Sequence, residues 1–486
     1  MFVIDSRNSL KSQLSPESHL LVLGPPRCGK TKNVVIPNVI ASQCATIVTS
    51  TKPDIFTATA SVRKAHGQVW VFDPFGTVSQ SLLDSQGAKK LNYSPLQDVT
   101  DFRNCILLAR SMVRSASQMS AERGSFWQER AEATLAPVFL AAKIAGWTMD
   151  NVMELIESKE VEPAYAHLVG SGQVEAARTL SSVIASAEKE RSGILSNAAG
   201  ILGAYRTPQV IEQSKSPNFS ADLFVGGKDT LYVIAPASDQ EVLAPLIVGL
   251  LWSIKDSAYK NATKQTLDSG YLSPVPQVKF ILDEMANVAP IHDLTSLLSE
   301  GASQGVLVLG VLQDLSQARA RWPGASDGMI TLFGNAMLFP GVSDLRTLDD
   351  FSKLSGEKLT MVPSRGAPDS LFGQHRRSLG GQIRPRLSIA ALNRLSPNQA
   401  LFYSGTRGFS RVEFDTNPNL EHAKSTENQA NLEHLSTELK PSLETDKIQN
   451  DLEVSFLGQY SPKKSRESSF VARIRNFASN PLRREI

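Results

Sequence analysis

The amino-acid sequence predicts an α/β fold with a mostly parallel sheet, an inserted all-helical domain and a disordered C-terminal tail. Seven short segments are almost continuous in Val, Ile and Leu, a pattern typical of parallel strands that are buried on both faces. Helix-like stretches separate several of these segments, which favours crossover connections. From residue 100 to residue 222 no segment reads as a strand. The expected strands are residues 20–23, 45–49, 69–72, 231–235, 278–282, 306–312 and 337–339.

Apolar residues recur with helical spacing in the strand-free region. Trp127 and Leu135 fall on one face of a predicted helix, and Pro137 within the same pattern is expected to kink or split it. Further helices are expected at 152–156 and 174–186. The region is therefore predicted to be all-helical and to interrupt the α/β domain.

Composition excludes several classes of protein. The 486 residues carry a net charge of only +2, so any contact with nucleic acid must come from a local patch. The three cysteines, Cys28, Cys44 and Cys105, have no C-x-x-C spacing, which argues against a disulfide framework or a zinc site and fits a reducing cytoplasm. We find no run of about 18 apolar residues and therefore expect no transmembrane segment in this chain. The first residues also lack a signal-peptide core.

The last 70 residues differ in composition from the rest. Residues 416–455 hold eight acids and three lysines with few aromatic residues, which predicts disorder. Residues 461–486 hold seven Lys or Arg and two acids, and Phe470, Ile474 and Phe477 are spaced as on one face of a helix. This end is either a basic amphipathic helix that binds anionic lipid, nucleic acid or a partner, or a solvated flexible tail.

One motif predicts the class of ligand. After the expected strand at 20–23, the sequence fits G-x-x-x-x-G-K-[ST], the phosphate-binding loop, and a helix is expected from Lys32 to Ile40. Backbone N–H groups of such a loop surround the β- and γ-phosphates, the lysine reaches the same phosphates, and the hydroxyl holds Mg²⁺. We therefore predict binding of ATP and Mg²⁺. The loop residues are Gly24, Pro25, Pro26, Arg27, Cys28, Gly29, Lys30 and Thr31.

Polar residues at the ends of two later strands complete the predicted site. Asp283 follows the strand at 278–282 and is expected to hold the Mg²⁺ shell together with Thr31. Glu284 is placed to polarise a water for attack on the γ-phosphate, which indicates hydrolysis rather than binding alone. Gln313 follows the strand at 306–312 and can contact both a phosphate oxygen and a water, as at the sensor position of RecA-like motors. Asp54 and Asp73 also follow strands, where ligand sites of parallel sheets collect.

Taken together, these segments resemble the type IV coupling protein family, the TraG/TraD-like conjugation ATPases. The resemblance covers about residues 18 to 410 in order. Its most specific parts are the phosphate loop with the following Val-Val-Ile-Pro at 34–37, Val-Phe-Asp-Pro at 71–74, Leu-Asp-Glu-Met-Ala-Asn at 282–287, Leu-Gln-Asp-Leu-Ser-Gln at 312–317 and Arg-Pro-Arg-Leu at 384–387.

The resemblance implies an overall organisation and a function. It implies a RecA-like nucleotide-binding domain in two parts, 1–99 and 223–414, a helical substrate-recognition domain at 100–222, and a tail at 415–486. Members are hexameric ATPases that pass single-stranded DNA with its relaxase, or protein, to a type IV secretion channel. They act in the bacterial cytoplasm at the inner face of the plasma membrane.

The sequence departs from the family pattern in two ways. Members usually begin with transmembrane helices, so this chain is expected to need a separate membrane-anchor partner, its basic tail or an anchor that is not in the sequence. Many members also have an arginine that acts in trans on the neighbouring nucleotide, and Ala302 stands at the corresponding place. Arg319, Arg321 and Arg346 are the candidates to replace it.

Two other functions stay open at this point. A nucleotide-gated recruitment adaptor of the secretion system, without translocation activity, would fit the absent trans arginine and the absent anchor. A soluble double-stranded DNA pump of the FtsK-like kind shares the ATPase core, but the inserted helical domain argues against it.

Overall fold

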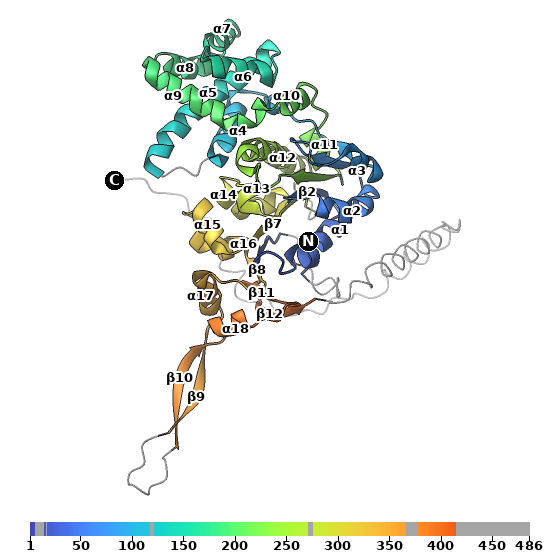
Figure 1. Ribbon diagram of the computed structural model, residues 1–486, viewed down its shortest axis with the longest axis vertical. Helices are drawn as coiled ribbons and strands as arrows, with labels where there is room; N and C mark the ends of the chain where they lie inside the picture. Colours follow the sequence, from blue (N-terminus) through green and yellow to red (C-terminus); the bar gives the residue numbers. More distant parts are fainter. Residues whose placement is uncertain (5–13, 16, 117–120, 271–275, 366–376, 415–486) are drawn as a thin grey trace, which may run out of the picture. The chain divides into compact units, whose positions relative to one another are not determined.

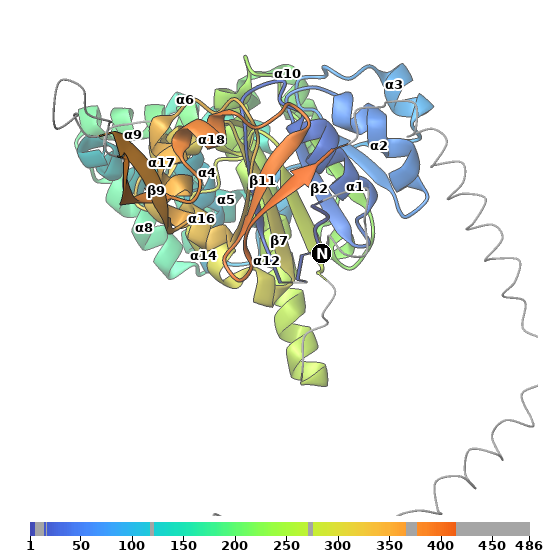
Figure 2. The same cartoon turned by 90° about the horizontal axis from the view of Figure 1, so that it is seen from below.

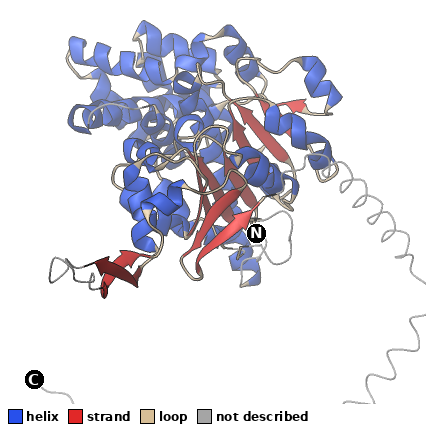
Figure 3. Cartoon of the chain, turned by 60° about the horizontal axis from the view of Figure 1, so that its bottom comes forward, coloured by secondary structure: helices blue, strands red, loops and turns tan. Residues whose placement is uncertain are grey.

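A computed structural model describes residues 1–4, 14–15, 17–116, 121–270, 276–365 and 377–414 of the chain. Ten strands form one sheet in the order β12-β11-β8-β1-β7-β6-β2-β5-β3-β4 (Figures 1 and 3). Strands β1 to β8 run parallel, whereas β11 is antiparallel to β8 and β12 to β11. The strands are β1 Leu20–Leu23, β2 Ala45–Ser50, β3 Val69–Phe72, β4 Lys89–Lys90, β5 Thr230–Ile234, β6 Val278–Leu282, β7 Val306–Leu312, β8 Asn335–Leu338, β11 Gln399–Ser404 and β12 Gly408–Glu413.

All seven predicted strands are present, within two residues at each end, which confirms a mostly parallel sheet. Strands β4, β11 and β12 were not predicted. Strand β4 has only two residues, both lysine, and β11 and β12 form the antiparallel end of the sheet with polar residues such as Gln399 and Ser410. Strands β4 and β12 lack the continuous apolar run that identifies a strand buried on both faces, whereas the Ala-Leu-Phe-Tyr run at 400–403 of β11 was an available signal.

Helices cover both faces of the sheet and create two cores (Figures 1 and 2). On one face, Val35 and Phe56 pack against strand residues such as Val22. This layer comprises the π-helix η1 Thr31–Val35, α1 Ile36–Ile40, α2 Asp54–Lys64 and α3 Gln80–Ser85. On the other face, strand residues such as Phe280 pack against a second set of helices. That set includes α12 Gln240–Ser269, α13 Met285–Val288, α14 Leu294–Glu300, α15 Leu315–Arg321 and α16 Met329–Phe333.

The region predicted to be helical contains helices and no strand among its described residues. It contains α4 Phe102–Ser115, α5 Ala121–Ala145, α6 Met149–Ser158, α7 Glu162–Gly170, α8 Val174–Ile184, α9 Glu188–Ile201, α10 Pro208–Lys215 and α11 Ala221–Val225 between β4 and β5. The short 3₁₀ helices η2 Pro95–Asp98 and η3 Gly203–Arg206 flank or join these helices, and η4 Ala302–Gln304 and η5 Ser326–Gly328 lie later in the chain. The domain boundaries at 99 and 222 stay a prediction, since residues 1–416 cluster as one compact unit.

Pro137 does not split its helix, which was one of the two predicted outcomes, and the other, a kink, stays a prediction. Helix α5 continues through Pro137 as a single element. Leu135, Val138 and Phe139 beside the proline are fully buried. This burial stabilises the helix although Pro137 donates no backbone hydrogen bond.

Helix α12 is the one described helix that by length and composition alone could cross a membrane. The apolar stretch lies within Gln240–Asp268, and 78% of the most apolar window is buried inside the protein. Its apolar residues belong to the core under the sheet, where Leu243, Ile247 and Leu250 are buried. Core packing therefore accounts for its composition.

Two further strands form a separate hairpin. Strands β9 Glu357–Arg365 and β10 Arg377–Pro385 pair with each other and with no other strand of the described ranges, and they project from the body beside α17 Leu345–Leu354 and α18 Ile389–Asn393 (Figure 1). The sequence analysis did not predict this hairpin. The predicted disorder at 416–455 and the predicted amphipathic end at 461–486 lie outside the described residues.

Candidate nucleotide site

The order of three strands positions the candidate site. Strand β7 lies between β1 and β6, and all three run parallel. Their carboxyl ends therefore lie at one edge of the sheet, where ligands of parallel sheets bind. The phosphate loop follows β1, Asp283 and Glu284 follow β6, and Gln313 follows β7. Segments about 250 residues apart in the sequence meet at this edge.

The backbone of the phosphate loop explains why glycines stand at its two ends. Gly29 has φ +94°, a conformation that side chains rarely adopt. A Cβ on Gly24 would lie 2.7 Å from Cβ of Phe339 and 2.6 Å from Sγ of Cys28, too close for any other residue. Arg27 is also left-handed, with φ +64°. A non-glycine residue in this region is uncommon, and such strain often marks a functional site.

Lys30 is buried within the phosphate loop, of which it is part. Its ammonium donates hydrogen bonds to the carbonyl oxygens of Gly24 and Pro25, the second at 3.0 Å. The ammonium group is therefore held inside the curve of the phosphate loop, as expected for a lysine that binds phosphate. Thr31 then begins the π-helix η1, a rare form that is frequent at functional sites.

A direct contact joins the loop to the acid pair. The Thr31 hydroxyl donates a hydrogen bond to Oδ2 of Asp283 at 3.3 Å. Thr49 at the end of β2 donates to the backbone carbonyl of Asp283 at 2.8 Å and so fixes the end of β6. A hydroxyl beside a carboxylate is the set of hard oxygen donors that Mg²⁺ binds together with phosphate and water. The residues present therefore fit the predicted ion.

Burial raises the pKa of Asp283 to about 6, and the neighbouring charge of Glu284 adds to the shift. The ammonium of Lys30 and the hydrogen bond from Thr31 lower the pKa, and Asp54 raises it. An ionised carboxylate that is buried here without a bound cation lowers the stability of the protein, and a cation bound beside it would remove this cost. Asp54 is thereby near the site, as the sequence analysis suggested.

Glu284 and Gln313 are held in different ways. Glu284 has φ +52° and precedes α13, so its side chain starts from a strained backbone at the end of β6. The backbone N–H of Gln313 donates to Oε1 of Gln317 at 2.8 Å, which closes the turn after β7. Asp73, in contrast, accepts hydrogen bonds from Thr77 and from the backbone of Val78. It closes its own turn on β3, three strands from β6.

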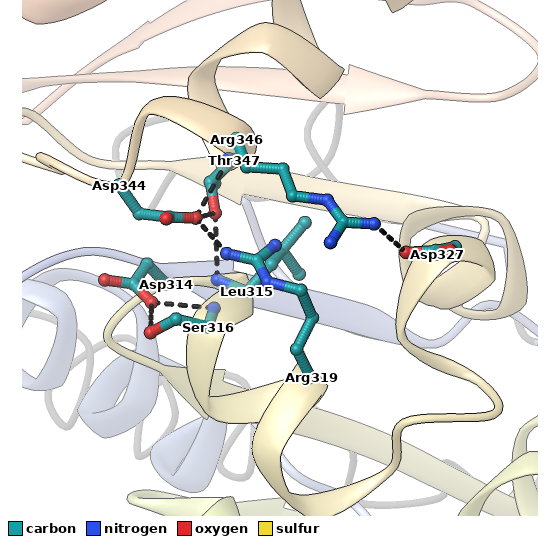
Figure 4. Close-up of polar contacts among 8 residues, drawn as sticks. All are labelled: Asp314, Leu315, Ser316, Arg319, Asp327, Asp344, Arg346 and Thr347. Atoms are coloured by element: carbon teal, nitrogen blue, oxygen red, sulfur yellow. Dashed lines mark hydrogen bonds and ion pairs between the residues drawn. The ribbon is translucent and has the colours of Figure 1, made fainter.

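The three candidate arginines for the trans position differ in how firmly they are held, and Figure 4 shows two of them, Arg319 and Arg346. Arg319 pairs with Asp344, which also accepts from the backbone and hydroxyl of Thr347. Arg321 donates to the backbone carbonyl of Ala286 at 3.0 Å. Arg346 makes an ion pair with the exposed Asp327 at 2.7 Å and keeps 58% of its side chain exposed. Arg346 is therefore the most accessible of the three candidates.

Comparison with known proteins identifies the family. A family model for type IV secretory system conjugative DNA transfer matches residues 4–399. The chain belongs to this family. The conjugal transfer protein TraG of Escherichia coli is 23% identical over 397 residues, which are 76% of this chain and 60% of TraG. VirD4 of Agrobacterium fabrum is 21% identical over 398 residues, 79% of this chain and 56% of VirD4.

This member of the coupling protein family thus spans about 60% of the length of the curated relatives that it matches. Its fold is that of the bacterial conjugative coupling protein TrwB, with a TM-score of 0.62 at 17% identity over 83% of this chain and 86% of TrwB. Another TrwB structure with the same coverage is a complex with ADP and Mg²⁺. The predicted RecA-like fold is confirmed by this likeness.

Sequence reasoning missed several residues that shape the site. Thr49 contacts Asp283, which only the fold brings near, whereas Gln317 contacts Gln313 only four positions away in the chain. Arg27 and Glu284 were predicted as site residues, but their left-handed backbones were not. The Leu-Gln-Asp-Leu-Ser-Gln motif did contain Gln317, so its second glutamine was the available signal.

Proposed function

We propose that the chain is an ATP-hydrolysing coupling protein that recruits relaxase-bound DNA, or a protein substrate, and drives it to a type IV secretion channel. The proposal rests on one observation above all. Strands β1, β7 and β6 lie side by side, and the Thr31 hydroxyl contacts the Asp283 carboxylate. This is the arrangement that binding of a nucleoside triphosphate with Mg²⁺ requires.

Each side chain of the site has a proposed role. The loop N–H groups and Lys30 bind the β- and γ-phosphates, and Thr31 and Asp283 hold the cation. Mg²⁺, when bound, neutralises charge that develops on the phosphates. Glu284 orients and deprotonates the attacking water, and Gln313 senses the γ-phosphate. The complex of TrwB with ADP and Mg²⁺ supports these ligands for this chain.

The partners are proposed from the family. The names of TraG as a conjugal transfer protein and of TrwB as a conjugative coupling protein support DNA and secretion channel components as partners. We propose a homo-hexamer with the nucleotide between subunits, at the inner face of the bacterial plasma membrane. A separate membrane-anchor protein is a further proposed partner.

One observation favours a second candidate function. Ala302 stands where many members have the trans arginine, and in the structure it lies in η4, just before β7. An arginine finger contributes about 10³ to 10⁵ in rate, so its loss would leave slow hydrolysis. The chain would then be a recruitment adaptor whose assembly, but not transport, depends on ATP.

Steady-state hydrolysis of ATP by wild type and Glu284→Gln tests the assignment. We expect both proteins to bind ATP with Mg²⁺, and only wild type to hydrolyse it. Equal turnover by the two proteins would exclude Glu284 as the base. ATP binding without turnover by wild type would favour the adaptor.

A further inference from the structure

The hairpin of β9 and β10, here called the arm, is the most anomalous surface among the described residues. It is a two-stranded sheet that pairs with none of the other described strands, and none of the described helices covers it along its length (Figures 1 and 3). A two-stranded hairpin is at best marginally stable in water unless one face packs against something. We therefore expect the arm to pack against a partner.

One face of the arm is apolar. The register places Leu359 opposite Ile383 and Met361 opposite Gly381, and residues that are directly opposite share a face. Leu359 and Ile383 are each 69% exposed and Met361 57% exposed. Leu359 also covers Gly381, where a Cβ would lie 3.1 Å from Leu359 Cδ1. Three large side chains thus form one patch that is open to solvent.

The arm is also strongly basic. Its two strands and Arg386 carry five basic residues, Lys358, Arg365, Arg377, Arg384 and Arg386, and one acid, Glu357, a net charge of 5 − 1 = +4. Arg384 donates to the amide oxygen of Gln382 at 2.7 Å, and Arg386 donates to the backbone carbonyl of Glu357 at 3.4 Å. Lys358, Arg384 and Arg386 take part in none of the ion pairs of the described residues. Their positive charge is not neutralised within the described part of the chain.

We propose that the arm docks on an anionic lipid surface. Leu359, Met361 and Ile383 would enter the boundary between headgroups and acyl chains, while Lys358 and Arg384, which the register pairs on the opposite face of the arm, would extend past its edges to the headgroup phosphates. A single strand of nucleic acid explains the charge but not three exposed apolar side chains, since its bases stack on aromatic and arginine side chains. A second arm of the same chain would bring like charges together. The proposal does not depend on ATP hydrolysis.

Co-sedimentation of the full-length chain with vesicles tests the proposal. We expect binding to phosphatidylglycerol vesicles and little binding to phosphatidylcholine vesicles, with a decrease as salt rises. Leu359→Gln with Ile383→Gln should reduce the partition coefficient by about tenfold, since both apolar contacts are lost. Lys358→Gln with Arg384→Gln should also reduce it and should weaken its salt dependence.

A matched pair of exposed leucines provides the control. Leu223 in α11 and Leu267 in α12 are 82% and 80% exposed and lie outside the arm. Leu223→Gln with Leu267→Gln should bind vesicles as wild type does. Circular dichroism and thermal unfolding establish that all three variants fold. The basic tail is unchanged in every protein, so a difference between variants reports on the arm.

Three outcomes would overturn the proposal. The first is equal binding of wild type and Leu359→Gln with Ile383→Gln to anionic vesicles. The second is DNA binding that is lost in Lys358→Gln with Arg384→Gln while vesicle binding persists, which would assign the arm to nucleic acid. The third is lipid-free self-association that depends on Leu359 and Ile383, which would assign the patch to a second copy.

Discussion

Asp283 shows at the scale of a single residue how binding and stability oppose each other. Its pKa lies at about 6, above the ordinary value of 3.8, chiefly because it is buried. The stability that this carboxyl contributes is therefore complete below about pH 4 and is lost as pH rises through 6. At pH 8 the ionised group destabilises the nucleotide-free protein.

Replacing this charge should stabilise the protein and remove its ligand. We expect Asp283→Asn to raise the free energy of unfolding at pH 8 by roughly 1–2 kcal/mol without nucleotide, and to gain much less at pH 4. The variant should also lose the thermal shift that ATP with Mg²⁺ gives wild type. Thermal unfolding at both pH values, with and without ligand, measures both effects. If Asp283→Asn were less stable than wild type at pH 8, this would contradict the free-energy cost assigned to the buried charge.

Two substitutions of Glu284 test its left-handed backbone conformation separately from its proposed role in hydrolysis. Glycine adopts φ +52° without strain, whereas glutamine keeps the strain and the shape of the side chain. We expect the free energy of unfolding of Glu284→Gly to exceed that of Glu284→Gln by about 0.5–1 kcal/mol. Both variants should lose ATP hydrolysis. Urea unfolding and steady-state hydrolysis of the pair test this. A less stable glycine variant would show that the side chain itself supports the turn.

At the scale of elements, Glu132 joins the first two inserted helices. Glu132 on α5 is 9% exposed and accepts from Arg110 at 3.0 Å and Arg114 at 2.9 Å on α4. Arg114 also contacts His292 at 3.0 Å, in the loop that follows α13. The base of the helical region is thus connected to the segment that follows Asp283 and Glu284.

Removing the buried acid should loosen this connection. We expect Glu132→Gln to lower the free energy of unfolding by about 1–3 kcal/mol, because two charge-assisted hydrogen bonds are lost. Glu175→Gln is the control: its pair with Arg178 is 71% exposed on both sides and should matter by less than about 0.5 kcal/mol. Urea denaturation compares the two. Equal losses would mean that the Glu132 contacts are no stronger than a surface pair.

The elements that the sequence predicted share a physical property. The buried parallel strands, such as β6 and β7, have apolar runs that identify them wherever they lie in the fold. In the arm and in β12, polar residues and Gly interrupt the apolar pattern, and which strands pair there does not follow from composition. Pro137 shows the converse, since tertiary packing of α5 outweighs a local preference.

At the scale of the whole molecule, the candidate site depends on strand order. The loop and acid motifs were readable from the sequence, but their adjacency was not, because β7 lies between β1 and β6 only in the folded sheet. Contacts such as that of Thr49 with Asp283 join residues 234 positions apart and leave no local signal. The roles of Lys30, Glu284 and Gln313 stay predictions.

The trans arginine is a prediction about the assembled protein. Arg346 has only a surface ion pair to give up, whereas Arg319 is part of the cluster with Asp344 and Thr347. We expect Arg346→Ala to lower turnover per site at least tenfold, without a change in thermal stability or ATP binding. Arg319→Ala should instead lower thermal stability. Unchanged turnover in Arg346→Ala would exclude it as the trans cation.

The most direct test of the central claim is steady-state ATP hydrolysis with and without single-stranded DNA, with the oligomeric state measured in the same samples. A DNA-translocating coupling protein should hydrolyse ATP faster when DNA is present and should assemble into rings under those conditions. Glu284→Gln should assemble but show no turnover. ATP binding without turnover under every DNA condition would contradict the claim and leave the recruitment adaptor as the function.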